Sequence, residues 1–263
     1  MSVLDTGVRN VRNVLRYTVG NGGLSNLSAM LSSRRVKEKA SVIFFVDEFF
    51  KNETDVISRL EIQIEDEVVF VPTKNEPTTD IIDQIVDRLR GQGLAQPCAI
   101  VGMGGGITMD VAKAVSNLLT NEGKAEEYQG WDLVKAPGIY KIAIPTLSGT
   151  GAEATRTCVM TNKKTGLKLG MNSDFTVYDQ IIMDPELTAT VPRNQFFYTG
   201  MDAYIHCIEA LAGQYRNPIG DAYSRETISL CRQVFLDEDM KSSANREKLM
   251  VASYLGGCAI ATS

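Results

Sequence analysis

The sequence predicts an α/β fold with a mostly parallel sheet, followed by an all-helical part. Two observations support this prediction. In the first part of the chain, short apolar runs alternate with amphipathic helical stretches, a pattern typical of a parallel sheet covered by helices on both faces. From Pro192 onward, only the helical spacing of apolar residues remains. We therefore expect an α/β domain over 1–191 and a helical domain over 192–263.

The expected strands are apolar runs that end at a polar residue, a glycine or a proline. They cover residues 14–19, 42–46, 68–71, 98–101, 142–144 and 181–183. Helices are expected between them, over 24–31, 79–90 and 108–119. Two more apolar stretches, 158–161 and 167–171, flank a turn at 162–166 and predict a β-hairpin.

The helical part contains three expected helices, over 194–212, 220–236 and 244–263. The last of these reaches the end of the sequence without a C-cap and without basic residues in its last turn. A helix that has been cut short explains this better than a natural end. We therefore expect the sequence to be a fragment of a longer chain, with an incomplete helical domain.

The composition excludes several classes of protein. The 263 residues are 44% hydrophobic and 22% charged, which is ordinary for a globular chain. The net charge of −5 and the pI near 5.1 argue against nucleic acid or an anionic membrane as a partner. No apolar run reaches the length of about 18 residues that a membrane-spanning helix needs.

The cysteines and the N-terminus indicate a cytoplasmic location. The N-terminal sequence has no apolar segment typical of a signal peptide. The five cysteines are odd in number, widely spaced and without a CxxC motif, which excludes a disulfide framework and a zinc knuckle. We expect most of them to be small buried residues in a reducing compartment.

Three consecutive glycines, Gly104, Gly105 and Gly106, follow an expected strand and open an expected helix. Glycines allow the backbone to approach a ligand closely, and a helix N-terminus offers free N–H groups, so this turn predicts a phosphate site. It is not the Rossmann pattern G-x-G-x-x-G, because Ile107 stands at the position of the last glycine. It is not a Walker loop either, because no Gly-Lys-Ser/Thr follows. The alternative is a tight strand-to-helix turn without a ligand.

Asp47 ends an expected strand, at the edge of the sheet where nucleotides bind. A carboxylate there can bind the two hydroxyls of an adenine ribose and would repel a 2′-phosphate, which favours NAD over NADP. The alternative is that Asp47 caps a helical segment that starts at Glu48.

A second loop rich in glycine, serine and threonine, 145–153, also follows an expected strand. The hydroxyls and backbone amides of this loop could bind phosphate or ribose. The alternative is an ordinary loop in which Thr150 and Glu153 form a capping box. Lys168 is an isolated cation in an expected strand, and without other information we expect its side chain to be solvent-exposed.

Asp202 and His206 stand four residues apart on an expected helix, so both lie on one face and could hold a divalent metal ion. His206 is the only histidine. The alternative is a simple pair between neighbouring turns or a capped core histidine. A metal needs further ligands, and carboxylates such as Glu209 or Asp221 could supply them. Iron and zinc both fit such ligands.

Taken together and in this order, these motifs resemble the iron-containing (group III) alcohol dehydrogenase family. The matching stretches are Asp47 after a strand, the glycines at 104–106 with Asp110 and Lys113 behind them, the loop 145–153, Lys168 and the segment 199–206. In that family an N-terminal α/β domain binds NAD(P), a helical domain holds the metal, and the active site lies between them.

The resemblance implies a role for each matching residue. Asp47 would bind the adenine ribose, and Lys168 would bind the nicotinamide ribose. The pyrophosphate would be bound by Gly104, Gly105 and Gly106, and the cofactor site would also include Asp110, Thr146 and Thr150. The first two metal ligands would be Asp202 and His206. Two departures stand out. The family usually has serine where this chain has Ile107, and its other two metal ligands are histidines farther downstream than Ser263.

Within the family, three stretches are similar to the 3-deoxy-manno-octulosonate (Kdo) 8-oxidase branch: 169–174, 200–206 and 255–263. This similarity implies oxidation of a primary alcohol of a sugar acid to an aldehyde, in lipopolysaccharide sugar biosynthesis. We expect a small-molecule alcohol or sugar-acid substrate, and a homodimer.

Two alternatives remain open. A dehydroquinate synthase-like or glycerol-phosphate dehydrogenase-like enzyme would use basic residues of the helical part, such as Arg193, Arg216, Arg225 and Arg232, to bind a substrate phosphate. A non-catalytic nucleotide-binding fragment would bind NAD without a metal.

Overall fold

The computed structural model describes residues 11–36 and 40–262, and its centre is a six-stranded parallel sheet. The strand order is β1-β9-β6-β4-β2-β3, and neighbouring strands pair in parallel. The strands are β1 (Arg16–Val19), β2 (Val42–Asp47), β3 (Glu67–Val71), β4 (Ala99–Gly104), β6 (Lys141–Pro145) and β9 (Gln180–Met183). The expected mostly parallel sheet is confirmed, with strand ends that differ from the expectation by a few residues.

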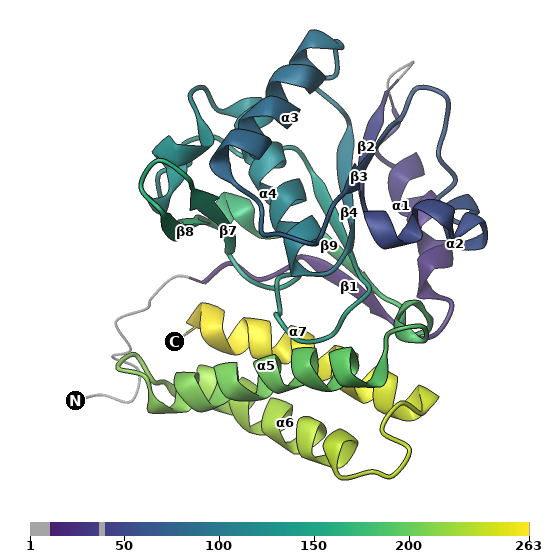
Figure 1. The fold of residues 1–263 in the computed structure, drawn as a ribbon, viewed down its shortest axis with the longest axis vertical. Coiled ribbons are helices and arrows are strands. Elements are labelled where there is room, and N and C mark those ends of the chain that lie inside the picture. Colours follow the sequence, from purple (N-terminus) through teal and green to yellow (C-terminus); the bar gives the residue numbers. More distant parts are fainter. Residues whose placement is uncertain (1–10, 37–39, 263) are drawn as a thin grey trace.

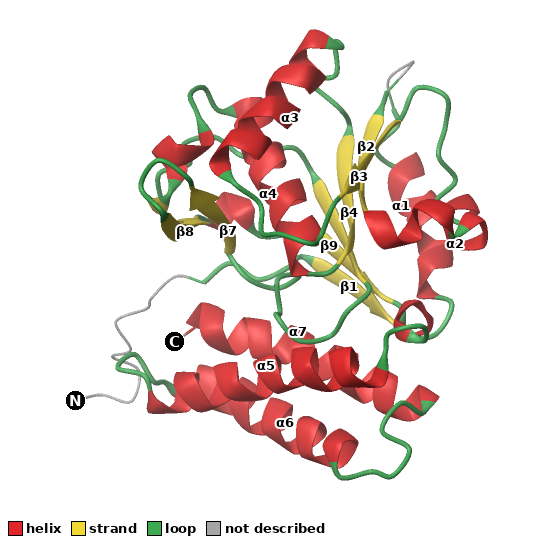
Figure 2. Ribbon diagram, in the orientation of Figure 1, coloured by secondary structure: helices red, strands yellow, loops and turns green. Residues whose placement is uncertain are grey.

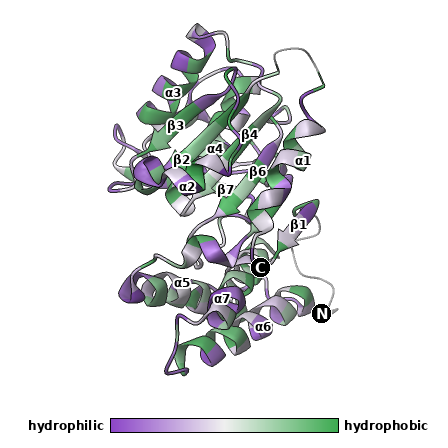
Figure 3. Ribbon diagram, turned by 90° about the vertical axis from the view of Figure 1, so that its right-hand side faces the viewer, coloured by the Kyte–Doolittle hydropathy of each residue, from purple (hydrophilic) through white to green (hydrophobic). Residues whose placement is uncertain are grey.

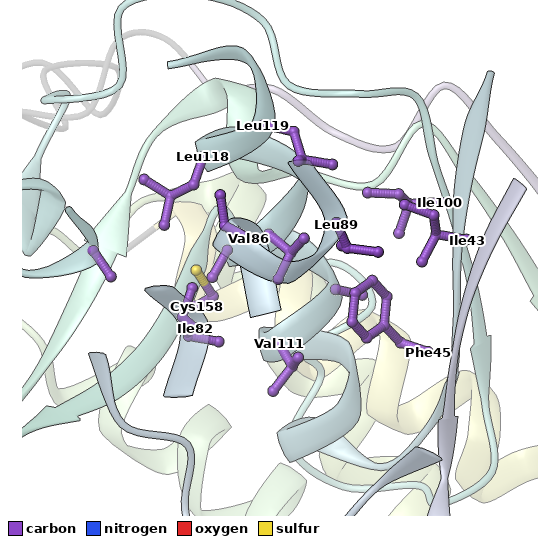
Figure 4. Close-up of a cluster of buried hydrophobic side chains, with 14 of the residues drawn as sticks. Ile43, Phe45, Ile82, Val86, Leu89, Ile100, Val111, Leu118, Leu119 and Cys158 are labelled. Carbon is purple, nitrogen blue, oxygen red and sulfur yellow. The ribbon is translucent and has the colours of Figure 1, made fainter. Parts of the chain in front are cut away.

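Helices cover both faces of the sheet, because its strands are apolar on both faces. They are α1 (Leu27–Ser32), α2 (Thr54–Ser58), α3 (Thr79–Gly91) and α4 (Gly106–Thr120), with short 3₁₀ helices at η1 (Gly23–Asn26), η2 (Glu48–Asn52), η3 (Ala125–Tyr128), η4 (Asp174–Thr176) and η5 (Pro185–Thr188). Figure 1 shows α3 and α4 on one face of the sheet and α1 and α2 on the other. Successive side chains of β2 point alternately to the two faces of the sheet. Ile43 and Phe45 pack with α3 and α4 (Figure 4), whereas Val42, Phe44 and Val46 pack with α1.

A second, small sheet lies beside α4 and has the order β5-β8-β7. The expected hairpin forms between β7 (Thr157–Asn162) and β8 (Leu167–Asn172), which pair antiparallel. The two-residue strand β5 (Gly130–Trp131) adds to β8 in parallel and was not expected from the sequence. A strand of this length carries no detectable alternation of apolar and polar residues, so only its partner in the folded chain reveals it.

Three long helices form a layer across one end of the sheet (Figure 1, Figure 2). They are α5 (Arg193–Ala212), α6 (Pro218–Phe235) and α7 (Ser243–Thr262), within two residues of the expected ends, and residue 263 lies outside the described part. The side-chain oxygen of Asn217 starts α6 by accepting the N–H groups of Ile219 at 3.1 Å and Gly220 at 3.0 Å. The α/β part followed by a helical part is therefore confirmed, whereas a domain boundary at residue 191 stays a prediction.

Hydropathy follows these layers. Figure 3 shows β2, β3 and β4 of the large sheet in hydrophobic colours, whereas purple, hydrophilic segments lie on the helices. Within the described residues, no helix combines the length and the apolar character that crossing a membrane would require. The five cysteines are all free, and four of them are buried, as expected for small core residues.

Candidate functional site

The carboxyl ends of the central strands face the helical layer, and two cavities lie at this junction. The first, the Asp47 cavity, has a volume of about 170 Å³ and is lined by Asp47, Thr73, Thr146, Leu147 and Val191, among others. The second, the His206 cavity, has a volume of about 370 Å³. Its polar and charged lining residues are Glu76, Asp110, Thr150, Thr155, Thr157, Lys168, Asp202 and His206.

The glycine turn lies between the two cavities. A Cβ atom built on Gly104 would come within 3.0 Å of the Cβ of Asp47, and Gly106 itself lines the His206 cavity. The middle glycine, Gly105, is the N-cap of α4 and has no side-chain hydrogen bond to cap the helix. The first N–H groups of α4 have no intrahelical acceptor, so they are available to an anion.

These glycines also have a packing reason to be glycine. A Cβ on Gly104 would lie 2.7 Å from the Cβ of Thr108, and a Cβ on Gly105 would lie 2.9 Å from Leu147. Both distances are shorter than real contacts allow. The glycines therefore also fit the tight-turn interpretation. The phosphate site stays a prediction, supported by the free N-terminus of α4 and the two flanking cavities.

Asp47 caps the 3₁₀ helix η2, which is one of the two roles expected for it. Its Oδ1 accepts the N–H of Phe49 at 3.0 Å and the hydroxyl of Thr73 at 3.3 Å. Both hydrogen bonds go to the same oxygen, and the residue lines a cavity. A cap through Oδ1 leaves Oδ2 free for a ligand, so the two interpretations are compatible.

The two threonines of the loop 145–153 lie at different cavities. Thr146 lines the Asp47 cavity, and its N–H donates to the carbonyl of Gly104 at 3.0 Å. Thr150 lines the His206 cavity, where its Oγ1 accepts the N–H of Ala152 at 3.2 Å. The capping-box alternative is wrong, because no helix begins at Thr150 and the side chain of Glu153 is buried against Ser253.

Asp202 and His206 face each other from successive turns of α5. Asp202 Oδ1 lies 3.5 Å from His206 Nε2, and both residues line the His206 cavity. The Nδ1 atom of His206 is buried and has no hydrogen-bond partner among the described residues. A carboxylate oxygen and an imidazole nitrogen at one cavity fit two positions in the shell of a divalent transition metal.

The carboxylates considered as further ligands do not complete this shell. Asp221 forms a close ion pair with Arg216, with Nε–Oδ1 2.9 Å, and this pairing lowers the pKa of Asp221. Glu209 is exposed and does not line the His206 cavity. Within the described residues, no group of three histidine, cysteine, aspartate or glutamate side chains could hold a metal ion. The described residues therefore offer only Asp202 and His206 as candidate metal ligands at this cavity.

The remaining charged residues at the His206 cavity are mostly paired. Lys168 forms an ion pair with Glu76, and its side chain is exposed at the cavity rim. Asp110 accepts the N–H of Val159 at 3.0 Å, and burial raises its pKa from 3.8 to about 6. Lys113, one turn farther along α4, is fully buried and donates to the carbonyls of Thr155 at 2.9 Å and Thr157 at 2.8 Å. It therefore anchors the start of β7.

Both parts of the chain match models of known protein families. The family described as "Iron-containing alcohol dehydrogenase" matches residues 15–185, and "Fe-containing alcohol dehydrogenase family, C-terminal" matches residues 196–263. The chain belongs to the iron-containing alcohol dehydrogenase family. This family uses NAD(H) and a divalent metal. The two expected cofactors, NAD and a divalent metal, are thus the ones that this family uses.

Individual relatives agree with this family. The sulfoacetaldehyde reductase of Bilophila wadsworthia is 36% identical over 193 residues, which are 72% of this chain and 49% of the relative. The NAD-dependent methanol dehydrogenase of Bacillus methanolicus is 30% identical over 74% of this chain and 51% of the relative. The chain thus spans about half the length of these curated relatives.

Solved structures agree on the fold. The NAD⁺ complex of the sulfoacetaldehyde reductase from Bifidobacterium kashiwanohense superimposes with a TM-score of 0.82 and 25% identity. The match covers 95% of this chain and 66% of that structure. The alcohol dehydrogenase from Oenococcus oeni has a TM-score of 0.85 at 23% identity, over 97% of this chain and 67% of that structure, which shows the shared fold.

Several residues that line the two cavities were not identified from the sequence. Thr73 and Glu76 follow β3, and the rule that ligands bind beyond the carboxyl ends of parallel strands could have found them. Ile260 also lines the His206 cavity, but it comes from α7. An apolar residue in a long helix gives no signal of such a place, because only the packing of α7 against the sheet brings it there.

Proposed function

We propose that this chain forms the NAD-binding part and half of the metal site of an alcohol dehydrogenase that interconverts a primary alcohol and an aldehyde. One observation supports this proposal most directly. Asp202 and His206 line the same cavity as Gly106 and Thr150, next to the free N-terminus of α4. A metal-ligating pair and a phosphate-binding turn on one cavity suit a reaction between a metal-held alcohol and a nicotinamide.

In this proposal the residues of the chain bind and orient the reactants. Gly104, Gly105 and Gly106 bind the pyrophosphate through backbone N–H groups, and Thr146 and Thr150 line the path of the dinucleotide on either side. Asp202 and His206 hold the metal. The chemistry supplied by the bound groups is Lewis-acid polarisation of the alcohol oxygen by the metal and acceptance of a hydride by NAD.

Asp47 supports NAD rather than NADP as the cofactor. Its carboxylate lines the cavity on the far side of the glycine turn from His206, where an adenine ribose would lie. A negative charge there favours two ribose hydroxyls and repels a 2′-phosphate. Lys168 and Asp110 belong to the opposite, nicotinamide end in this proposal, where the ammonium group of Lys168 is exposed enough to reach a ribose hydroxyl.

The substrate, the assembly and the location stay predictions. The Kdo 8-oxidase branch rests on similarity in three stretches, and the relatives named above reduce sulfoacetaldehyde or oxidise methanol. A homodimer in the cytoplasm is the expectation from the sequence. A phosphate-bearing substrate is less favoured, because Arg216 is paired with Asp221 and no arginine of the described residues lines the His206 cavity.

The proposal is tested by separating NAD binding from metal binding. We expect His206→Ala to abolish Zn²⁺ or Co²⁺ binding in equilibrium dialysis, because one of two donors is lost, while NAD affinity in calorimetry stays within about twofold. Asp221→Asn is the matched control and should bind metal as the wild type does. Equal metal binding by His206→Ala would refute the metal site. NAD binding without any metal binding would favour the non-catalytic alternative.

A further inference from the structure

The loop 145–153 is in backbone-to-backbone contact with two helices of the helical layer. A Cβ atom on Gly149 would lie 1.9 Å from the carbonyl oxygen of Thr199 on α5. A Cβ atom on Gly151 would lie 2.5 Å from the Cα of Gly257 on α7. No side chain fits at either contact, so the position of this loop is set by α5 and α7 together.

A buried hydrogen-bond chain holds the same loop at one point of α7. The N–H of Gly149 donates to Ser253 Oγ at 2.9 Å, and the Ser253 hydroxyl donates to Glu153 Oε1 at 2.8 Å. Ser253 and Glu153 are each 1% exposed. One serine thus connects the two ends of the segment 149–153 to the helical layer.

Glu153 is in an environment that favours the neutral acid. Burial raises its pKa, the hydrogen bond from Ser253 lowers it, and the charge of Lys113 also lowers it. Its second oxygen, Oε2, is buried without a hydrogen-bond partner in the described part of the chain. An unpartnered buried carboxylate oxygen is costly when charged, so an amide of the same shape should replace this side chain well.

The segment that these contacts hold carries Thr150, which lies between the two halves of the proposed site. A Cβ on Gly106 would lie 3.1 Å from Thr150 Oγ1, and Thr150 shares the His206 cavity with Asp202. Thr199, which Gly149 touches, is three residues before Asp202 on α5. The segment therefore contacts the glycine turn on one side and the helix of the metal pair on the other.

We propose that Ser253 and Glu153 are positioning residues, which hold Thr150 at the nicotinamide end of the cofactor site. This inference rests on the proposed NAD-binding function. Thr146, at the adenosine end, is held separately by its bond to Gly104 and by β6. Loss of the Ser253 hydroxyl should therefore disturb the nicotinamide end and leave the adenosine and pyrophosphate end in place.

The experiment compares NAD with ADP, which lacks the nicotinamide riboside, by calorimetric titration of the whole chain. We expect Ser253→Ala to weaken NAD binding about tenfold and ADP binding by less than about twofold, because two buried hydrogen bonds are lost at one end only. Glu153→Gln keeps an acceptor for the serine hydroxyl and should bind NAD within about twofold of the wild type. Thr227→Val is the control, since its buried hydroxyl bonds α7 at Ala252 but does not touch the loop.

The outcomes separate this inference from the proposed function. Should Ser253→Ala fail to fold, Ser253→Cys takes its place, with a loss of at least about threefold expected for NAD only. Equal losses for NAD and ADP, no loss for NAD, or a Glu153→Gln variant as weak as Ser253→Ala would overturn the positioning role. A wild-type chain that binds neither NAD nor ADP would instead contradict the proposed function.

Discussion

Asp110 illustrates how the fold changes the chemistry of a single residue. Burial raises its pKa from 3.8 to about 6, the charge of Lys113 opposes this shift, and the hydrogen bond from Val159 opposes it too. Between these two pKa values the folded chain binds more protons than the unfolded chain. The free energy of unfolding therefore falls as the pH rises through this window, and the contribution of the neutral acid is lost above the folded-state pKa.

Replacing this carboxyl should remove the pH dependence. We expect Asp110→Asn, which can still accept the Val159 N–H, to be more stable than the wild type by roughly 2 kcal/mol at pH 8. The difference should shrink as the pH falls to about 3, below both pKa values, where the wild-type acid is mostly neutral in both states. Urea unfolding at several pH values measures it. A difference that is the same at every pH would contradict the buried-carboxylate explanation.

At the scale of elements, the loop 145–153 differs from an ordinary connection because it has no room for a side chain at Gly149 or Gly151. Its Gly149 meets the carbonyl of Thr199, and Gly151 meets Gly257, so β6 and the helices α5 and α7 are joined by direct backbone contact. A glycine at such a contact cannot be replaced without moving a backbone, whereas Gly91 at the end of α3 has no atom within 4 Å of a built Cβ.

This contrast gives a matched pair of substitutions. Gly149→Ala should lower the free energy of unfolding by about 3 kcal/mol or more, because the added methyl would overlap the Thr199 carbonyl. Gly91→Ala should change it by less than about 1 kcal/mol and in the stabilising direction, since alanine favours a helix. Chemical denaturation of both variants provides the measurement. Similar effects at the two positions would mean that the loop moves freely away from α5.

At the scale of the whole molecule, one hydrophobic core joins the sheet to the helical layer. Met250 of α7 packs in the same cluster as Met109, Tyr178 and Ile181 of the α/β part. A shared core makes the two parts unfold together, because neither can expose its side of the core alone. The cleft that carries the candidate site is therefore a joint product of both parts.

Met250→Ala should test this coupling. We expect a loss of about 2–4 kcal/mol, seen equally by far-UV circular dichroism and by the fluorescence of Trp131, the single tryptophan, which lies in the small sheet. Met240→Ala is the comparison, because Met240 is buried in a separate cluster that is made mainly of residues of the helical layer. If the Trp131 signal of Met250→Ala keeps its wild-type midpoint while the helical signal shifts, the two parts unfold independently.

The sequence by itself determined the local structure and the identity of the main motifs. Apolar runs and helical stripes predict nearly every strand and helix, since these patterns depend only on neighbouring residues. The glycine turn, Asp47 and the Asp202–His206 pair were found in the same way, because each is a short segment with its own chemistry.

Tertiary structure decided what these segments do together. It brought Glu76, Thr150 and Ile260 to the cavity of His206 and added β5 to the small sheet. It also buried Glu153 against Ser253, where the sequence suggested a helix cap. The physical reason is that contacts between segments a hundred residues apart depend on how the layers pack, and no local spacing of residues encodes that packing.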